Sequence, residues 1–356
     1  MRIFVTFILP QNEVAARGLS FAAANFSRAL VCGRCFDKTY SVLPTSEYGP
    51  LNITQDEEYE VIYSSLRTRR PLRYLAVIYE QIKIFTKIRK NDSVWLYNLN
   101  FLTGILYILL GVFKPSVKRN VILLDFTPAT SIFQQNYWWI KLLNKADSSI
   151  VLSPNINLKC KKISCLPGVV PYHNEIYPEI NEFNNHFLLS GTITNSISLT
   201  NQVLQAFSEL PHCVLHITGN ILSDYEQIRD YASKFKNIIY YERQNYDDYI
   251  RLLHSVTYVL STRDPHAPEN MHNFPSKIIE GLLHNRVVIS TIQYPQLKGL
   301  YLKTVRHDHL KEDIESFVSD ENVVLEFYAN QSIKVKQLYN PKIWGNVMSN
   351  LENTMS

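Results

Sequence analysis

Residues 273–291 read NFPSKIIEGLLHNRVVIST, in which a polar start, an apolar periodic run and a β-branched run follow one another. Pro275 suits the first position of a helix, and Asn273 suits its cap. The run Val287–Thr291 is typical of a strand buried in a parallel sheet. The stretch therefore predicts a helix over Ser276–His284 that leads directly into a core strand.

The same alternation runs along the whole chain and predicts a parallel α/β architecture. In the first half we expect strands near Ile3–Leu9, Ser93–Tyr97, Asn120–Leu124 and Ser149–Leu152. The helices expected between them are Leu19–Leu30, Pro71–Lys90, Phe101–Val112 and Ser131–Asn144. After the polar stretch Tyr172–Asn185 come strands near His186–Ser190, Val214–Thr218, Asn237–Tyr241, Val256–Ser261 and Val287–Thr291. Their helices are Leu199–Leu210, Asp224–Phe235, Tyr246–His254 and Ser276–His284.

This pattern predicts two Rossmann-like domains, residues 1–172 and residues 173–339. A helix within residues 340–356, opening after Pro341, either finishes the second domain or crosses back to the first.

Composition narrows the possible functions. The 356 residues carry 36 Lys and Arg against 32 Asp and Glu, a formal charge of +4, which does not indicate a nucleic-acid binder. The 11 glycines form neither G-x-G-x-x-G nor G-x-x-x-x-G-K-[ST], which excludes a standard NAD fingerprint and a P-loop. No cofactor is expected.

The location expected from the sequence is cytoplasmic. Five cysteines, an odd number in a long chain, favour a reducing compartment over a disulfide framework, and a zinc site formed by two Cys pairs is the alternative. The apolar start of the chain lacks a cleavage site and is interpreted as a strand. The run Phe101–Phe113 is too short to span a bilayer and predicts a core helix.

The start of the helix at Ser276 has the features of an anion site. Backbone amides at a helix start favour phosphate, and the Lys277 ammonium adds positive charge there. Glu280 lies one turn further on the same face and could accept hydrogen bonds from hydroxyl groups. The alternative is a capped helix with an ordinary Lys–Glu surface pair.

The block Phe274–Glu280, with Val287–Thr291 behind it, resembles the donor-nucleotide motif of retaining glycosyltransferases of family four and their relatives. Those proteins have the GT-B fold, in which two Rossmann-like domains face a central cleft. Supporting matches precede the block in the expected order: Ala146-Asp147 with Ser153, Pro167–Val169, Ser190–Thr192, Gln205–Phe207, His216–Gly219 and Tyr246–Leu253. The resemblance covers Asp147–Thr291 and depends on the order and spacing of these pieces.

The resemblance implies roles for particular residues. Glu280 would hold the ribose hydroxyls, the Ser276–Lys277 helix start would hold the diphosphate, and Gly191 would let the backbone approach the phosphate or sugar. Gly219, which ends the neighbouring strand, belongs to the same binding set.

The chain also departs from the family pattern. His272 stands eight residues before Glu280, where the family often has a second glutamate, and is the candidate catalytic residue near the donor sugar. The basic residues often found just after the Gly191 position are absent, so Arg263 and Lys277 are the cations left to neutralise a diphosphate.

No metal is expected. The sequence contains no D-x-D, and cations with backbone amides can stabilise a leaving diphosphate instead. The His307-Asp308-His309 run is interpreted as facing solvent.

In the first domain, the loops Pro10–Gly18 and Asp125–Thr127 follow predicted strands, where parallel sheets bind ligands. An acceptor site is expected there, with Asp125 either orienting an acceptor hydroxyl or capping the next segment.

The segment Leu66–Asp92 carries eight Lys and Arg against two acidic residues. Tyr74, Ile78, Ile82 and Phe85 recur near helical spacing, so basic and apolar faces adjoin, as suits an anionic membrane surface. A basic helix with its apolar face in the core is the alternative.

Together these features predict a GT-B glycosyltransferase that moves a sugar from a nucleotide-sugar donor to a saccharide or lipid-linked acceptor in cell-surface polysaccharide or lipopolysaccharide synthesis. A non-catalytic nucleotide-sugar-binding or scaffold protein and a nucleotide-sugar epimerase of similar fold are the alternatives.

Overall fold

The computed structural model describes residues 1–8, 21–42, 55–56, 61–63, 72–129, 131–134, 136–170, 177–180, 182–221 and 223–353. The chain divides into two compact units. The first comprises Met1–Tyr172, His272–Phe274 and Tyr339–Ser356, and the second comprises His173–Met271 and Pro275–Leu338. Each unit is described by itself.

The first unit is built on an eight-stranded sheet in the order β3-β4-β2-β1-β5-β6-β7-β8. Every described pairing in it is parallel except that of β3 with β4. The strands are β1 (Arg2–Thr6), β2 (Lys38–Ser41), β3 (Gln55–Asp56), β4 (Val61–Tyr63), β5 (Ser93–Tyr97), β6 (Lys118–Leu123), β7 (Ser148–Val151) and β8 (Ile163–Cys165). All of β5 is buried, as expected for a strand covered on both faces.

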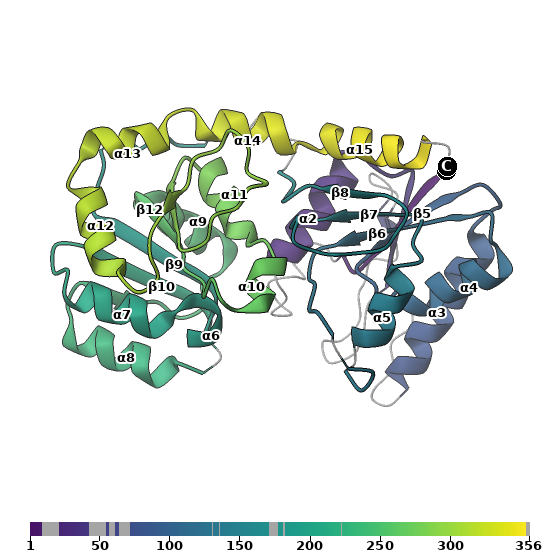
Figure 1. Cartoon of the computed structure of the whole chain (residues 1–356), viewed down its shortest axis with the longest axis horizontal. Coiled ribbons are helices and arrows are strands. Elements are labelled where there is room, and N and C mark those ends of the chain that lie inside the picture. The colour runs from purple at the N-terminus through teal and green to yellow at the C-terminus, as the bar shows by residue number, and fades with distance from the viewer. Residues whose placement is uncertain are drawn as a thin grey trace. The chain divides into compact units, whose positions relative to one another are not determined.

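Two helical layers cover this sheet. One layer contains α3 (Arg73–Lys87), α4 (Gly104–Phe113) and α5 (Asn136–Leu143), and the other contains α2 (Phe21–Cys32) and α15 (Pro341–Asn353). The arrangement follows from right-handed crossovers, because the step from β1 to β2 runs opposite to the steps from β5 through β7 (Figure 1).

The C-terminal helix α15 packs on the first unit. The fully buried Trp344 donates its indole N–H to the carbonyl of Gly168 (2.8 Å). The Glu352 carboxylate accepts hydrogen bonds from Arg2 (2.7 Å) and from the Trp95 indole N–H (2.7 Å). The last helix therefore belongs to the first unit, although the chain reaches it through the second.

The second unit is a six-stranded parallel sheet in the order β11-β10-β9-β12-β13-β14. Its strands are β9 (His186–Ile193), β10 (Val214–Ile221), β11 (Ile238–Tyr240), β12 (Tyr258–Ser261), β13 (Val287–Ser290) and β14 (Lys303–Thr304). Its helices are α6 (Asn195–Ser198), α7 (Thr200–Ser208), α8 (Tyr225–Lys234), α9 (Tyr246–Ser255), α10 (Pro268–His272), α11 (Ser276–Leu283), α12 (Leu310–Val318), α13 (Glu321–Tyr328) and α14 (Gln331–Tyr339). The ends of α10 and α14, His272 and Tyr339, group with the first unit.

The structure bears out the alternation predicted from the sequence, with additions. The two sheets, parallel in every described pairing except that of β3 with β4, confirm the predicted α/β class. The strands β2, β3, β4, β8 and β14 and the helices α6, α10, α12, α13 and α14 were not predicted. The loop Pro10–Gly18 lies outside the described residues.

The prediction that the apolar run Phe101–Phe113 forms a core helix is wrong for one face of α4. Leu106, Tyr107 and Leu110 are buried, but Val112 and Phe113 are exposed. None of the helices in the described ranges is both long and apolar enough to span a membrane.

Candidate functional site

The second sheet has a topological switch point beside β9. The chain passes from β9 to β10 and β11 on one side and then returns to place β12 on the other side. Ligands of open parallel sheets bind beyond the carboxyl ends of the strands at such a point. The site is therefore expected where β9 and β12 end, beside the start of α11.

Two glycines shape the end of β9. Gly191 and its register partner Gly219 on β10 both have positive φ, +99° and +141°. A Cβ at Gly219 would lie 2.1 Å from the Gly191 carbonyl oxygen, so the two strands approach too closely there for any side chain. A Cβ at Gly191 would meet no described atom within 4 Å. The backbone at Gly191 thus borders open space in which a ligand could lie.

The helix α11 begins at Ser276, with Pro275 at the N-cap position and no side-chain capping bond. Ser276 is exposed. The predicted cap, Asn273, is wrong: its side-chain oxygen accepts from the Phe126 amide (2.7 Å), and its side-chain nitrogen donates to the Phe126 carbonyl (3.1 Å). The positive end of the α11 dipole consequently carries no capping oxygen of its own.

Lys277 turns back from the start of α11 toward β9. Its half-buried ammonium donates a hydrogen bond to the Ser190 carbonyl (3.1 Å), which precedes Gly191. Burial, together with the nearby positive charge of Arg263, lowers the pKa of Lys277 to about 7, while Glu280 opposes the shift. Two cations held this close would both be stabilised by an anion.

Arg263 follows the end of β12, and its backbone is held by two hydrogen bonds to the Thr291 side chain. Its amide donates to the Thr291 hydroxyl oxygen (2.7 Å), and that hydroxyl donates to the Arg263 carbonyl (2.5 Å). Its guanidinium donates to the side-chain oxygen of Asn270 (3.3 Å). Arg263 and Lys277, both singled out from the sequence, therefore lie in one electrostatic environment.

Glu280 accepts a hydrogen bond from the Tyr249 hydroxyl through Oε2 (2.7 Å). Burial raises the pKa of Glu280, and the Tyr249 hydrogen bond and Lys277 both oppose that rise. The pKa of Tyr249 is raised as well, by burial and by the negative charge of Glu280. The sequence did not predict that Tyr249 pairs with Glu280, because no local feature distinguishes Tyr249 from Tyr246 on the same helix.

The structure places the remaining two candidates in the first unit. The His272 ring meets the Phe126 ring edge-on at 5.5 Å, and its buried Nδ1 has no hydrogen-bond partner among the described residues. Asp125 is exposed and directly precedes Phe126. The pKa of Tyr97 is raised chiefly by the burial of Tyr97 itself and secondly by the negative charge of Asp125. The two hydrogen bonds between the Asn273 side chain and the Phe126 backbone join the segment that follows His272 to the segment that follows Asp125.

In the part of the chain that the structure describes, no three His, Cys, Asp or Glu side chains come close enough together to hold a metal ion. None of the five cysteines, all of which lie among the described residues, forms a disulfide.

Solved structures with the same architecture exist, although sequence comparison finds no relative. No protein-family model matches the sequence, and no curated protein matches it significantly. The apo structure of OtsA superposes with a TM-score of 0.66 at 9% identity, covering 100% of both chains. HepE from Anabaena, in complex with UDP and glucose, gives 0.63 at 11% identity over 100% of both chains. The lipopolysaccharide outer core galactosyltransferase WaaB gives 0.60 at 14% identity over 99% of both.

Proposed function

Starting from the GT-B fold that these likenesses show, we propose that the chain is a retaining glycosyltransferase that transfers a hexose from a nucleotide-sugar donor to an acceptor. The observation that carries the proposal is the convergence of Lys277, Arg263 and the start of α11, with Glu280 one turn further along. HepE, one of the structural neighbours, is described in complex with UDP and glucose.

In this proposal the cations and the helix start hold the donor diphosphate. Their positive charge stabilises the negative charge that develops on the diphosphate as its bond to the sugar breaks, so the reaction needs no metal. Glu280 binds the ribose through Oε1, because Oε2 is already engaged by Tyr249. Gly191 lets the phosphate or sugar lie against the end of β9.

His272 and Asp125 are proposed to act on the sugars. The buried Nδ1 of His272, which has no hydrogen-bond partner in the part of the chain that the structure describes, supports a role in contacting a donor-sugar hydroxyl or the leaving phosphate. The exposed carboxylate of Asp125 is proposed to orient the acceptor hydroxyl.

The proposed acceptor is a saccharide or lipid-linked saccharide used in cell-surface polysaccharide or lipopolysaccharide synthesis, at the cytoplasmic face of the plasma membrane. The neighbour WaaB, named as a lipopolysaccharide outer core galactosyltransferase, supports this acceptor class.

Turnover tests the proposal. The protein is incubated with UDP-, GDP- and ADP-hexoses and saccharide acceptors in EDTA, nucleoside diphosphate release is measured, and the product anomer is identified by NMR. Acceptor-dependent release with retention, equal in wild type and in the surface control Glu326→Ala, supports it.

Other results would overturn the proposal in different ways. An inverted product or strict dependence on a divalent ion would contradict the mechanism. Tight nucleotide binding without turnover would identify a binding protein, and acceptor-independent conversion of one donor into another would identify an epimerase.

A further inference from the structure

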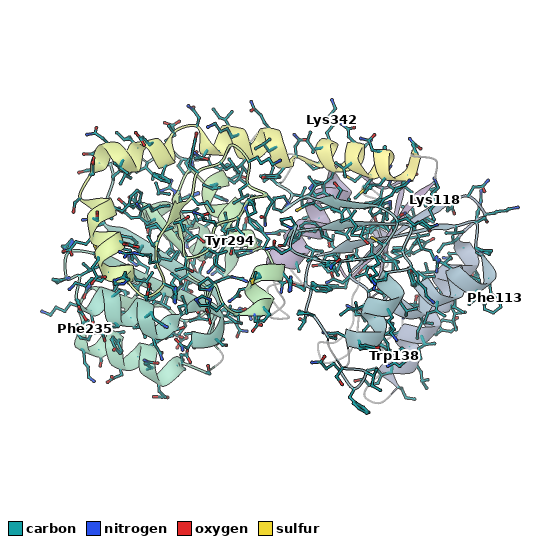
Figure 2. The ribbon with its side chains drawn as sticks, in the orientation of Figure 1. Phe113, Lys118, Trp138, Phe235, Tyr294 and Lys342 are labelled. Carbon is teal, nitrogen blue, oxygen red and sulfur yellow. The ribbon has the colours of Figure 1, made fainter. Side chains whose placement is uncertain are left out.

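One surface of the first unit has an unusual composition. Of the nineteen large apolar side chains that are exposed among the described residues, eleven lie between Leu72 and Trp138. All eleven belong to the layer of α3, α4 and α5 or to the segments that flank it. Figure 2 shows Phe113 and Trp138 at the outer surface of this layer.

The helix α3 carries a stripe of apolar side chains on its exposed face. Leu72, Leu75, Tyr79 and Ile82 recur at helical spacing and are all exposed, Leu75 to 62% and Tyr79 to 55%. The opposite face is buried and packs its own apolar side chains, such as Val77 and Ile84, into the core beside Glu80 and Gln81. The core therefore does not account for the apolar stripe of this helix.

Gln81 is a polar residue on the buried face of α3, and hydrogen bonds satisfy its side chain there. Its side-chain nitrogen donates to the Phe101 carbonyl (2.9 Å), and its side-chain oxygen accepts from the Leu106 amide (3.0 Å) at the start of α4. At the other end of the two helices, the Lys114 ammonium, just after α4, donates a hydrogen bond to the Phe85 carbonyl of α3 (2.6 Å). These contacts fix the rotation of α3 against α4 and hold the apolar stripe on the surface.

The stripe continues onto α4, which contains no charged residue. Ile108, Val112 and Phe113 are exposed there, and the Phe113 ring meets Phe85 of α3 edge-on. We call the exposed apolar residues of both helices, with Leu72 just before α3, the apolar face: Leu72, Tyr74, Leu75, Tyr79, Ile82, Ile108, Val112 and Phe113.

The charge around the apolar face is almost entirely positive. Residues 72–145 contain ten Lys and Arg and three acidic residues. Two of the three, Glu80 and Asp92, are each only 5% exposed, which leaves Asp125 as the exposed acid of that range. Lys87 and Lys90 are exposed at the end of α3, and on α5 the Lys141 ammonium lies 5.3 Å from the ring of Trp138.

We propose that the apolar face docks on the surface of an anionic phospholipid bilayer. Such a surface offers hydrocarbon just below its negative headgroups, which matches an apolar stripe bordered by cations. Nucleic acid would match the charge but not the apolar stripe. The inference uses residues of the first unit alone and does not depend on the proposed donor site.

Co-sedimentation with vesicles tests the inference without an activity assay. The full chain should sediment with phosphatidylcholine vesicles containing phosphatidylglycerol and remain in solution with phosphatidylcholine alone. Binding should weaken when salt is raised from 0.1 M toward 1 M, because the screening length falls from about 10 Å to about 3 Å.

Two variants separate the apolar and charged contributions. Leu75→Ser with Tyr79→Ser and Val112→Ser removes apolar area, and Lys87→Glu with Lys90→Glu reverses charge. Each should reduce vesicle binding at least tenfold. These side chains are exposed, so thermal unfolding should stay close to that of the wild type.

Matched variants in the second unit serve as controls. Leu325→Ser with Ile333→Ser and Leu338→Ser removes three exposed apolar side chains, and Lys236→Glu with Lys298→Glu reverses two exposed charges. Both should bind vesicles as the wild type does.

Three results would overturn the inference. The wild type could ignore anionic vesicles at low salt, or the first-unit variants could bind them as well as their controls do. In the third result, the wild type would self-associate in sedimentation velocity without binding vesicles, and the triple serine variant of the first unit would be monomeric. The apolar face would then be an interface between copies of the chain.

Discussion

The helices α11 and α3 both depart from the usual pattern in which charged side chains face water and apolar ones are buried. The helix α11 partly buries charge, and α3 exposes apolar side chains. In α11 the charged Lys277 and Glu280 are drawn into partial burial, whereas in α3 the apolar Leu75 and Tyr79 are turned to solvent. Partial burial of charge and exposure of a large apolar side chain both cost stability. A bound molecule would offset both costs: an anion would stabilise the charges at α11, and an apolar phase would cover the side chains at α3.

The largest expected effect concerns the two glycines beside α11. Gly219→Ala should lower the free energy of unfolding the most, because a strained backbone and a forced contact with Gly191 each cost about 1–3 kcal/mol. Gly191→Ala should cost only the strain, since its Cβ meets no described atom, yet it should weaken nucleotide binding. Urea unfolding and nucleotide titration check both. Equal stability losses in the two variants would contradict the assigned geometry.

The next effect is on pH dependence. Burial and Arg263 hold the pKa of free Lys277 at about 7, and a bound diphosphate should raise that pKa. Binding then takes up a proton above pH 7. Nucleotide affinity should be fully present below pH 7, where free Lys277 is already protonated, and fall by up to tenfold per pH unit above pH 7.

Calorimetry in buffers of different ionisation enthalpy measures this proton uptake. Lys277→Arg keeps its charge throughout this range and should remove the decline. A decline of the same size in that variant would show that another group is responsible.

A smaller effect is expected at Tyr249. Tyr249→Phe removes the hydrogen bond to Glu280, and a typical hydrogen bond contributes about 0.5–1.5 kcal/mol, so affinity should fall up to roughly tenfold. That bond also opposes the rise in the pKa of Glu280, so the acid limit of binding should move to higher pH. An affinity loss without this movement would mean that Tyr249 only supports the fold. Tyr246→Phe, on the same helix, is the matched control.

The smallest effect is expected on α3. Leu75→Ser should change the free energy of unfolding by no more than about 0.5 kcal/mol, because the side chain packs little against the core. Leu106→Ser, which alters a fully buried side chain of α4, should cost several times more. A large loss for Leu75→Ser in urea unfolding would show that the apolar face packs against another part of the chain.

The sequence predicted elements well wherever local pattern and burial agree. The strand β5 has the predicted bounds, Ser93–Tyr97, because all five of its residues are buried, and α11 begins at the predicted Ser276. Short strands such as β2 and β8 were missed, since a run of three or four residues of mixed polarity carries little periodic signal.

The errors have tertiary causes. Asn273 was predicted as a cap from its local position, but its amide pairs with the backbone of Phe126, 147 residues away. The sequence left open whether the apolar residues of α3 face the core or the surface, because the rotation of this helix depends on hydrogen bonds that Gln81 makes to the distant Phe101 and Leu106. Tyr249 and Glu280 are 31 residues apart, and only the fold brings them together.

The most direct test of the central claim is a calorimetric titration of UDP, GDP, ADP and CMP into the wild type, Glu280→Ala and Lys277→Ala. The surface variants Glu326→Ala and Lys298→Ala are the controls. At least one nucleotide should bind the wild type and both controls equally. Each lost charge-assisted contact is worth roughly 1.5–3 kcal/mol, so both site variants should bind about ten- to a hundredfold more weakly. Unchanged affinity in both site variants, or no binding of any nucleotide to the wild type, would contradict the account.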